Sequence, residues 1–299
     1  MLVRRLRGLP PIDLRRSLSP LVASAQDPTV RLRDQAVVRV LSSPEGPATL
    51  ELRREGDGFL GRAWGAGATW ALDAAPGLLG AHDDRDGFEP WRHDVLARAD
   101  RAHPSLRIVR SGLIHDLLVP TILAQRVTAG EAARSWTRLV RRWGRPAPGP
   151  HGLLLAPGAD ELAATPYWAF HELGVERSRA VTIARACRRL DRLQEAVDLP
   201  PPAALERLTA IPGLGPWTAA LVLRVAAGHA DAVEVGDYHV KNHVAWALAC
   251  EARAHDGRML ELLEPFAGHR GRVVRLLLAG APRAPAFGPR KRVVPVDHL

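Results

Sequence analysis

The residue types that could carry chemistry gather in one stretch, residues 205–249, which reads LERLTAIPGLGPWTAALVLRVAAGHADAVEVGDYHVKNHVAWALA. A carboxylate, Asp237, follows Gly215 by 22 residues and stands at the start of an amphipathic segment. An Asp at that place usually caps a helix, because its oxygens accept N–H groups that the first turn leaves free. A fixed carboxylate can also stabilise positive charge that develops on a substrate. Asp237 is therefore the first candidate catalytic residue, and the two roles are compatible.

The residues before Asp237 predict two helices joined by a tight turn. Residues 211–215 read IPGLG, and Gly213 and Gly215 on either side of one apolar residue suit positive φ angles and close backbone approach. Pro216 fits the first turn of the next helix, where its missing N–H costs nothing. The free N–H groups at the start of that helix can hold a phosphate without reading base sequence. The alternative interpretation is a plain glycine-containing helix connection.

Motifs for other common chemistries are missing from the sequence. Lys241 and Lys291 are the only lysines, and neither stands in a nucleotide-binding P-loop. The 12 histidines show no HExxH spacing for zinc, and no GxSxG serine-hydrolase motif is present. The two cysteines are too few for a disulfide framework or a four-thiolate iron–sulfur cluster. The acidic run HDDRDGFEP at residues 82–90 fails the EF-hand pattern and is predicted to be a solvated loop.

The charge balance points toward a polyanionic partner. The chain has 41 Lys and Arg against 32 Asp and Glu, a formal net charge of +9. Such a balance is typical of nucleic-acid binding, although it also occurs in proteins with only a solvated charged surface. No apolar run reaches the ~18 residues that span a bilayer, and the N-terminus lacks the apolar region of a secretory signal. We expect a monomeric, cytoplasmic, nucleoid-associated protein with no membrane partner.

The pattern along the chain divides it into a β-rich part and a helical part. Residues 29–72 show short alternating runs broken at 44–46 and 56–58, which predicts hairpins. From residue 91 the apolar residues recur at helical spacing. The expected helical segments are 115–143, 158–174, 177–193, 202–210, 216–228, 237–252 and 257–280. We therefore predict an α+β fold with a small β-containing N-terminal domain, residues 1–90, and a larger all-helical domain, residues 91–299.

At the IPGLG turn and Asp237 the sequence resembles the helix–hairpin–helix DNA glycosylase superfamily, and within it the bacterial DNA-3-methyladenine glycosylase II family. The string HPSLRIVRSGLIHDLLVPTILAQRVT, residues 103–128, is similar to the family's helix with a Gln-rich motif. The resemblance is strong over 103–145 and 205–249 and weak before residue 80. It implies the family's fold and its reaction, excision of alkylated bases from double-stranded DNA.

The resemblance implies roles for single residues. Asp237 matches the family's catalytic aspartate. Trp217 occupies the position where bifunctional relatives carry a nucleophilic lysine, and a tryptophan cannot form a Schiff base, so no lyase step is implied. Gln125 and Arg126 fall where the family places the residue that fills the gap left by a flipped base. Arg126 is either that wedge or a phosphate contact.

The same resemblance implies a full set of site residues. The base pocket is expected to include Gln125, Trp217, Leu221 and Tyr238. The DNA contacts are expected from Arg126, Gly213, Gly215 and Thr218. The backbone carbonyls of Thr209, Ile211 and Leu214 match positions that bind a monovalent cation in relatives. No other cofactor is expected.

Two positions depart from the family pattern. Leu221 and Gly280 stand where the alkylation enzyme has aromatic residues that line its base pocket, which leaves the lesion open. A base alkylated at a ring nitrogen is already cationic and leaves as a neutral molecule, so one carboxylate suffices where most sugar hydrolases need two. The alternatives are a glycosylase of the same fold for another lesion, such as oxidised purines, and a non-catalytic helix–hairpin–helix DNA-binding protein.

Overall fold

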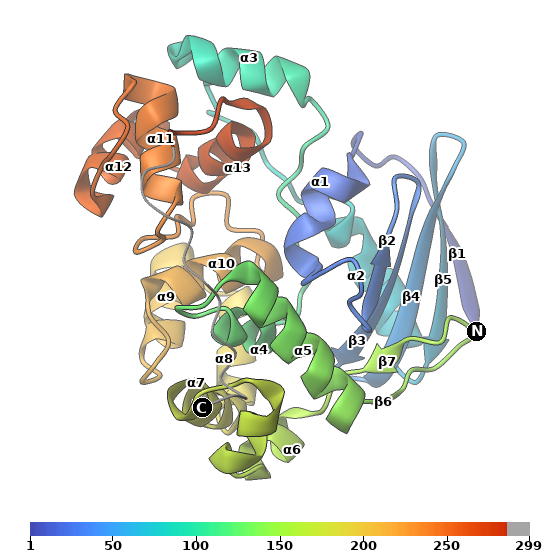
Figure 1. The fold of residues 1–299 in the computed structure, drawn as a ribbon. Coiled ribbons are helices and arrows are strands. Elements are labelled where there is room, and N and C mark those ends of the chain that lie inside the picture. Colours follow the sequence, from blue (N-terminus) through green and yellow to red (C-terminus); the bar gives the residue numbers. More distant parts are fainter. Residues whose placement is uncertain (286–299) are drawn as a thin grey trace.

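The computed structural model describes residues 1–285, in which an antiparallel sheet lies beside a larger group of helices (Figure 1). The sheet has the strand order β1-β5-β4-β3-β2. Its strands are β1 (Leu2–Leu6), β2 (Val30–Leu32), β3 (Ala36–Ser43), β4 (Gly46–Glu55) and β5 (Gly58–Gly65), and a separate ribbon pairs β6 (Arg145–Pro146) with β7 (Leu154–Leu155). The predicted α+β class is confirmed. The predicted turns are confirmed too, because residues 44–45 join β3 to β4 and residues 56–57 join β4 to β5.

Helices form most of the remaining described chain. The α-helices are α1 (Leu14–Leu18), α2 (Ala68–Leu78), α3 (Asp94–Ala102), α4 (His115–Leu123), α5 (Ala129–Trp143), α6 (Ala159–Ala164), α7 (Arg177–Cys187), α8 (Leu190–Gln194), α9 (Pro201–Thr209), α10 (Pro216–Ala226), α11 (Val240–Ala249), α12 (Asp256–Leu263) and α13 (Arg270–Gly280). Short 3-10 turns are η1 (Ser19–Leu21), η2 (Pro90–Arg92), η3 (Tyr167–Leu173), η4 (Glu195–Val197) and η5 (Glu264–Phe266).

The structure corrects several expected boundaries. Residues 68–72, predicted as part of the β-rich region, begin helix α2. The expected helix over 115–143 is interrupted at residues 124–128, because Thr128 forms a capping box with Glu131 and starts a new helix there. The expected helix over 257–280 is likewise two helices, α12 and α13. Apolar spacing continues across these breaks, so periodicity alone did not reveal them.

Two apolar cores hold the described chain together. One core joins the sheet to α2, α4, α5, α7, α9 and α10, with Leu50, Leu118 and Val222 among its buried residues. The second core belongs to a four-helix lobe formed by α3, α11, α12 and α13, and includes Leu96 and Val244. Figure 1 shows this four-helix lobe at the top, with α3 beside α13 although they are far apart in sequence. The predicted division at residue 90 stays a prediction.

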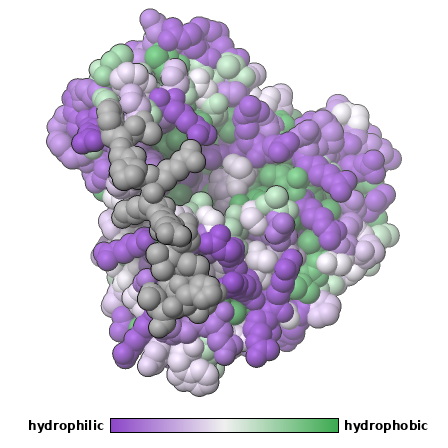
Figure 2. Space-filling view, in the orientation of Figure 1, coloured by the Kyte–Doolittle hydropathy of each residue, from purple (hydrophilic) through white to green (hydrophobic). Residues whose placement is uncertain are grey.

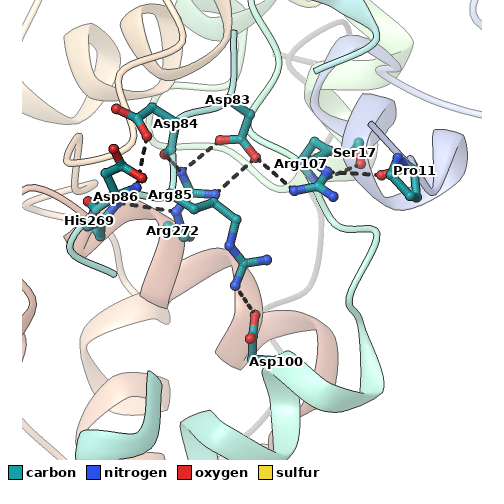
Figure 3. Close-up of polar contacts among 10 residues, drawn as sticks. All are labelled: Pro11, Ser17, Asp83, Asp84, Arg85, Asp86, Asp100, Arg107, His269 and Arg272. Atoms are coloured by element: carbon teal, nitrogen blue, oxygen red, sulfur yellow. Dashed lines mark hydrogen bonds and ion pairs between the residues drawn. The ribbon is translucent and has the colours of Figure 1, made fainter. Parts of the chain in front are cut away.

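The loop at residues 82–90 connects the four-helix lobe to the N-terminal part (Figure 3). Its prediction as a solvated loop holds for His82, Asp84, Asp86 and Gly87, which are exposed, but not for the side chain of Asp83. The Asp83 side chain is only 1% exposed, and it accepts two hydrogen bonds from Arg272 of α13, at 2.7 and 3.0 Å. Arg107 lies 3.9 Å from the same carboxylate and donates to the Pro11 carbonyl. The partner of Asp83 is 189 residues away in the chain, so a local acidic pattern could not reveal it.

Among the residues that the structure describes, no helix is long and apolar enough to cross a membrane.

Candidate active site

The predicted helix–hairpin–helix is present, formed by α9, a turn at residues 210–215 and α10. The Leu214 N–H donates to the Ile211 carbonyl at 2.9 Å and closes the turn. Gly213 has φ +101°, and a Cβ there would lie 2.3 Å from the Thr182 hydroxyl of α7. Gly215 has φ −84°, so the predicted positive φ holds only for Gly213. A Cβ on Gly215 would meet no atom within 4 Å, so this side of the turn is open to a ligand.

Replacing Gly213 with alanine is expected to destabilise the protein. The backbone conformation alone costs about 1–3 kcal/mol for a residue with a Cβ, and the contact with Thr182 adds to this. The matched change Gly215→Ala is expected to alter the free energy of unfolding by less than about 1 kcal/mol, because its backbone is extended and its surroundings are open. Urea titrations of both variants check this, and equal stabilities would contradict the role given to Gly213.

Asp237 is held in one orientation by three N–H donors. Its Oδ1 accepts from the backbone N–H groups of His239 and Val240, at 2.8 and 2.9 Å. Its Oδ2 accepts from Nε1 of Trp217 at 2.9 Å. Helix α11 begins at Val240, and His239 holds its N-cap position. Asp237 stands two residues before the N-cap, and its carboxylate still caps the first turn of the helix. The half-buried Asp237 side chain therefore has a fixed direction.

One face of α10 lies beside Asp237. Trp217, Leu221 and Arg224 recur at intervals of four and three residues, which places them on the same side of the helix. Trp217 and Leu221 are partly exposed, whereas Arg224 is buried and forms an ion pair with the buried Glu234. Two contacts therefore tie α10 to the segment that carries Asp237, one at Trp217 and one at Arg224, with Leu221 between them.

The loop between α4 and α5 is attached to the hairpin through Gln125. Its Nε2 donates to the Gly213 carbonyl at 3.0 Å and to the Thr218 hydroxyl at 2.8 Å. The next residue, Arg126, is exposed and has φ +58°, a conformation that residues with a Cβ rarely adopt. Gln125 thus brings Arg126 next to the hairpin, and the strained backbone there marks a tip held by its surroundings.

Two of the expected site residues, Thr218 and Tyr238, lie differently from their predicted roles, and Gly280, noted as a departure from the family pattern, lies in a contact between helices. Thr218 is buried and its hydroxyl accepts from Gln125, so its side chain is not available for a DNA contact. Tyr238 is 76% exposed and its ring packs edge-on against His239, so it does not line an enclosed pocket with Asp237. Gly280 faces α3, where a Cβ would lie 3.1 Å from Ala99 and His103. Gly280 allows two helices to approach and is not a pocket residue.

Two arginines that join helices of the described chain, the buried Arg179 and the half-buried Arg275, were missed from the sequence. Arg179 of α7 donates to the Leu123 carbonyl at the end of α4, just before Gln125, and burial lowers the pKa of its guanidinium. Arg275 of α13 donates to the Arg16 carbonyl, and burial beside Arg224 lowers the pKa of Arg275 to about 10. The sequence signal that could have revealed them is an arginine at a position of a helix that faces the core, because a buried charge needs a hydrogen-bond partner.

The predicted cation ligands lie at the last residue of α9, Thr209, and in the hairpin turn, at Ile211 and Leu214. The Ile211 carbonyl accepts one hydrogen bond, from Leu214, and keeps a second lone pair. The Thr209 hydroxyl donates to the carbonyls of Leu205 and Glu206, so this hydrogen bond does not involve the Thr209 carbonyl. Carbonyl oxygens are ligands that hard cations accept, so the residues present fit such an ion.

The arrangement combines two chemical capacities. The start of α10 offers free backbone N–H groups beside the open Gly215, which suits a phosphate. Asp237 offers a fixed anion next to an indole ring, which suits a positive charge that develops on a bound group. The hairpin connects the two, because Trp217 lies in the first turn of the same helix.

Comparisons with known proteins agree with this geometry. Residues 119–267 match the model of the HhH-GPD superfamily of base excision DNA repair proteins. A curated relative from Mycobacterium tuberculosis, described as a probable bifunctional transcriptional activator/DNA repair enzyme AlkA, is 30% identical over 155 residues. That match covers 50% of this chain, and the chain spans only 30% of the length of that relative.

Solved structures show the same fold over nearly the whole chain. A 3-methyladenine DNA glycosylase from Archaeoglobus fulgidus superposes with a TM-score of 0.75 at 17% identity, covering 93% of this chain and 98% of the other. An 8-oxoguanine glycosylase/lyase from Clostridium acetobutylicum, in complex with double-stranded DNA, gives a TM-score of 0.71 at 14% identity, covering 93% and 97%. The family match spans both the hairpin and Asp237, and this chain belongs to the helix–hairpin–helix superfamily of base-excision DNA glycosylases.

Proposed function

We propose that this chain is a monofunctional DNA glycosylase that hydrolyses the N-glycosidic bond of alkylated bases, of the 3-methyladenine type, in double-stranded DNA. The observation that carries the proposal is the 2.9 Å hydrogen bond from Trp217 to Asp237. It pairs a fixed carboxylate with an aromatic ring at the position where a lyase needs a lysine. Lys241 is the one lysine within residues 1–285, and its Nζ lies 3.2 Å from the Asp256 carboxylate in an ion pair. The product is a free base and an abasic site.

The mechanism assigns the main catalytic work to Asp237. An alkylated purine carries a positive charge, so it departs as a neutral molecule and needs no protonation by an acid. Positive charge then develops on the deoxyribose, and the Asp237 carboxylate stabilises it and orients the attacking water. Trp217 fixes the direction of the carboxylate and offers its ring to the cationic base. The target nucleotide has to leave the helix stack to reach these groups.

The DNA backbone is proposed to bind at the hairpin and at the neighbouring Arg126. Backbone N–H groups beside Gly215 hold a phosphate, and Arg126 lies beside them. A monovalent cation held by the carbonyls of Thr209, Ile211 and Leu214 would add positive charge near that phosphate. The protein is proposed to act on DNA as a monomer.

Affinity for undamaged duplex DNA is expected to fall steeply with salt. Phosphate contacts release bound counterions, so a chain with a net charge of +9 loses affinity as salt rises. We expect a loss of about tenfold or more between about 50 and about 200 mM NaCl. Fluorescence anisotropy with a labelled duplex measures this, and an affinity that does not change with salt would contradict phosphate-based binding.

Replacing Arg126 with alanine is expected to slow excision of well-paired lesions more than of mismatched lesions. Extrusion of a paired base costs a few kcal/mol, and a side chain that fills the gap offsets part of that cost. The matched control is Arg142→Ala, which removes the same charge from an exposed site at the end of α5. Single-turnover rates on both duplexes distinguish the two roles, since equal slowing would make Arg126 a phosphate contact.

A second candidate function is excision of oxidised purines. The favouring observation is Leu221, which stands beside Trp217 where an alkylation enzyme would place an aromatic ring. Release of free base from duplexes that each carry one lesion separates the two functions. Faster release of 3-methyladenine or 7-methylguanine than of 8-oxoguanine supports the proposal, and the reverse order overturns it. Binding without release of any base would indicate a non-catalytic DNA-binding protein.

A further inference from the structure

A groove of about 970 Å³ lies away from Asp237, between α1, strand β2 and the end of α5. Its lining includes five apolar residues, which we call its floor, Val22, Val30, Leu32, Leu153 and Leu154, beside the polar Ser19, Ser24 and Gln26. Its rim carries Arg15, Arg31, Arg33 and Arg141. Figure 2 shows this region as a hydrophobic patch bordered by hydrophilic atoms, on the face between α1, β2 and α5. The role proposed for Asp237 uses none of these residues.

Strand β2 forms one wall of the groove and is the last strand of the sheet. In its antiparallel pairing with β3, Thr29 accepts from Val40 and Arg33 donates to Ala36. Backbone groups alternate in direction along a strand, so Val30 and Leu32 direct their N–H and C=O groups away from β3. At Pro28 this outer edge is already extended, because the Leu154 N–H donates to the Pro28 carbonyl at 2.9 Å. The next positions of the edge, Val30 and Leu32, line the groove.

The charges of the groove favour an acidic occupant. Arg33 and Arg141 are exposed, and neither forms an ion pair with an acidic side chain within residues 1–285. Arg15 lies 3.5 Å from Asp34 in a highly exposed pair, which contributes little. The groove's own carboxylate, Asp27, is buried and accepts hydrogen bonds from the N–H groups of Ala23 and Thr29 and from Trp136. Positive charge therefore surrounds an apolar floor.

We propose that this groove binds an extended acidic segment of a partner protein, which adds to the sheet as a strand beside β2. Backbone pairing at Val30 and Leu32 would supply the alignment, alternate apolar side chains would cover the floor, and alternate carboxylates would meet Arg33 and Arg141. A nucleic-acid strand fits less well, because phosphates would face the outward carbonyls of β2 and an apolar surface. The chain's own C-terminal residues fit less well too, since PRKRVVPVDHL is basic.

Fluorescence anisotropy with a labelled seven-residue peptide that alternates aspartate and valine tests the proposal. We expect saturable binding, and no binding of the same peptide with lysine in place of aspartate. The double variant Arg33→Glu/Arg141→Glu is expected to weaken binding about tenfold or more. The control Arg98→Glu/Arg101→Glu changes the charge equally at exposed positions on α3, in the four-helix lobe, and is expected to bind as wild type does.

Methylation of alternate backbone nitrogens in the peptide separates strand addition from simple charge attraction. Loss of binding in one methylation register only is expected for a strand. Equal binding of all peptides, or equal weakening by both double variants, would overturn the proposal. If a single-stranded oligonucleotide displaces the peptide as well as unlabelled peptide does, the proposal is overturned in favour of nucleic acid. If light scattering shows dimers that Arg33→Glu/Arg141→Glu abolishes, it is overturned in favour of a second copy of this chain. Base release by Arg33→Glu/Arg141→Glu is expected to match wild type, so this result is independent of the proposed glycosylase activity.

Discussion

Replacement of Asp83 by alanine is expected to lower the free energy of unfolding by about 3–5 kcal/mol, because it leaves a buried guanidinium without its partner. The side chains of Asp83 and Arg272 are only 1% and 3% exposed, and the two hydrogen bonds between them join the loop at 82–90 to α13. Arg107 lies close to the same carboxylate. The change therefore weakens the attachment of the four-helix lobe to the N-terminal part, in the region that Figure 3 shows.

The matched control is Asp73→Ala, which breaks an exposed ion pair with Arg4. The two side chains there are 42% and 60% exposed, so the loss is expected to stay below about 1 kcal/mol. Urea unfolding at neutral pH measures both variants. Similar small losses would contradict the view that Asp83 holds the lobe in place.

The parts of the fold that sequence analysis predicted depend on local patterns. Alternating residues between two turn signals predicted strands β3, β4 and β5, and the IPGLG turn predicted the hairpin. The family resemblance named Trp217 and Asp237 separately as site residues, and the structure places these two side chains in direct contact. Turn signals and the IPGLG motif can be recognised in the sequence because the geometry of a turn is set by residues that are neighbours in the chain.

The parts that were missed depend on contacts between distant residues. Arg272 and Asp83 are 189 residues apart, and Arg179 binds a carbonyl 56 residues before it. Periodicity records which face of a helix is apolar, but not which buried charge will meet which partner. The surroundings of Gly280 could not be predicted for the same reason, because only the packing of α13 on α3 shows which side it faces.

Replacement of Asp237 by asparagine is expected to lower the rate of base release by about 10²–10³, because it removes the negative charge that stabilises the developing sugar cation. Asparagine is nearly isosteric, and its oxygen can still accept from the N–H groups of His239 and Val240. Its amide nitrogen would face the Trp217 N–H, which donated to Oδ2. The double variant Asp237→Asn/Trp217→Phe removes that conflict between two donors and should be as slow as, or slower than, Asp237→Asn.

The matched control is Trp217→Phe alone, which keeps the carboxylate and an aromatic ring but removes the hydrogen bond to Asp237. It is expected to slow release by about tenfold, since a single hydrogen bond to a charged group contributes about 1.5–3 kcal/mol at most. Melting temperatures and duplex affinities of all three variants should remain close to wild type, because none of the changes removes a core residue or a hairpin amide.

The measurement that tests the central claim most directly is single-turnover release of free base from a duplex with one N-alkylated purine, compared between wild type and Asp237→Asn. The account predicts that wild type releases the base and leaves an unbroken abasic strand, and that the folded, DNA-binding variant is slower by about 10²–10³. A folded variant that releases the base at the wild-type rate would contradict the assignment of Asp237. A strand cleaved by wild type without added base would contradict hydrolysis without a lyase step.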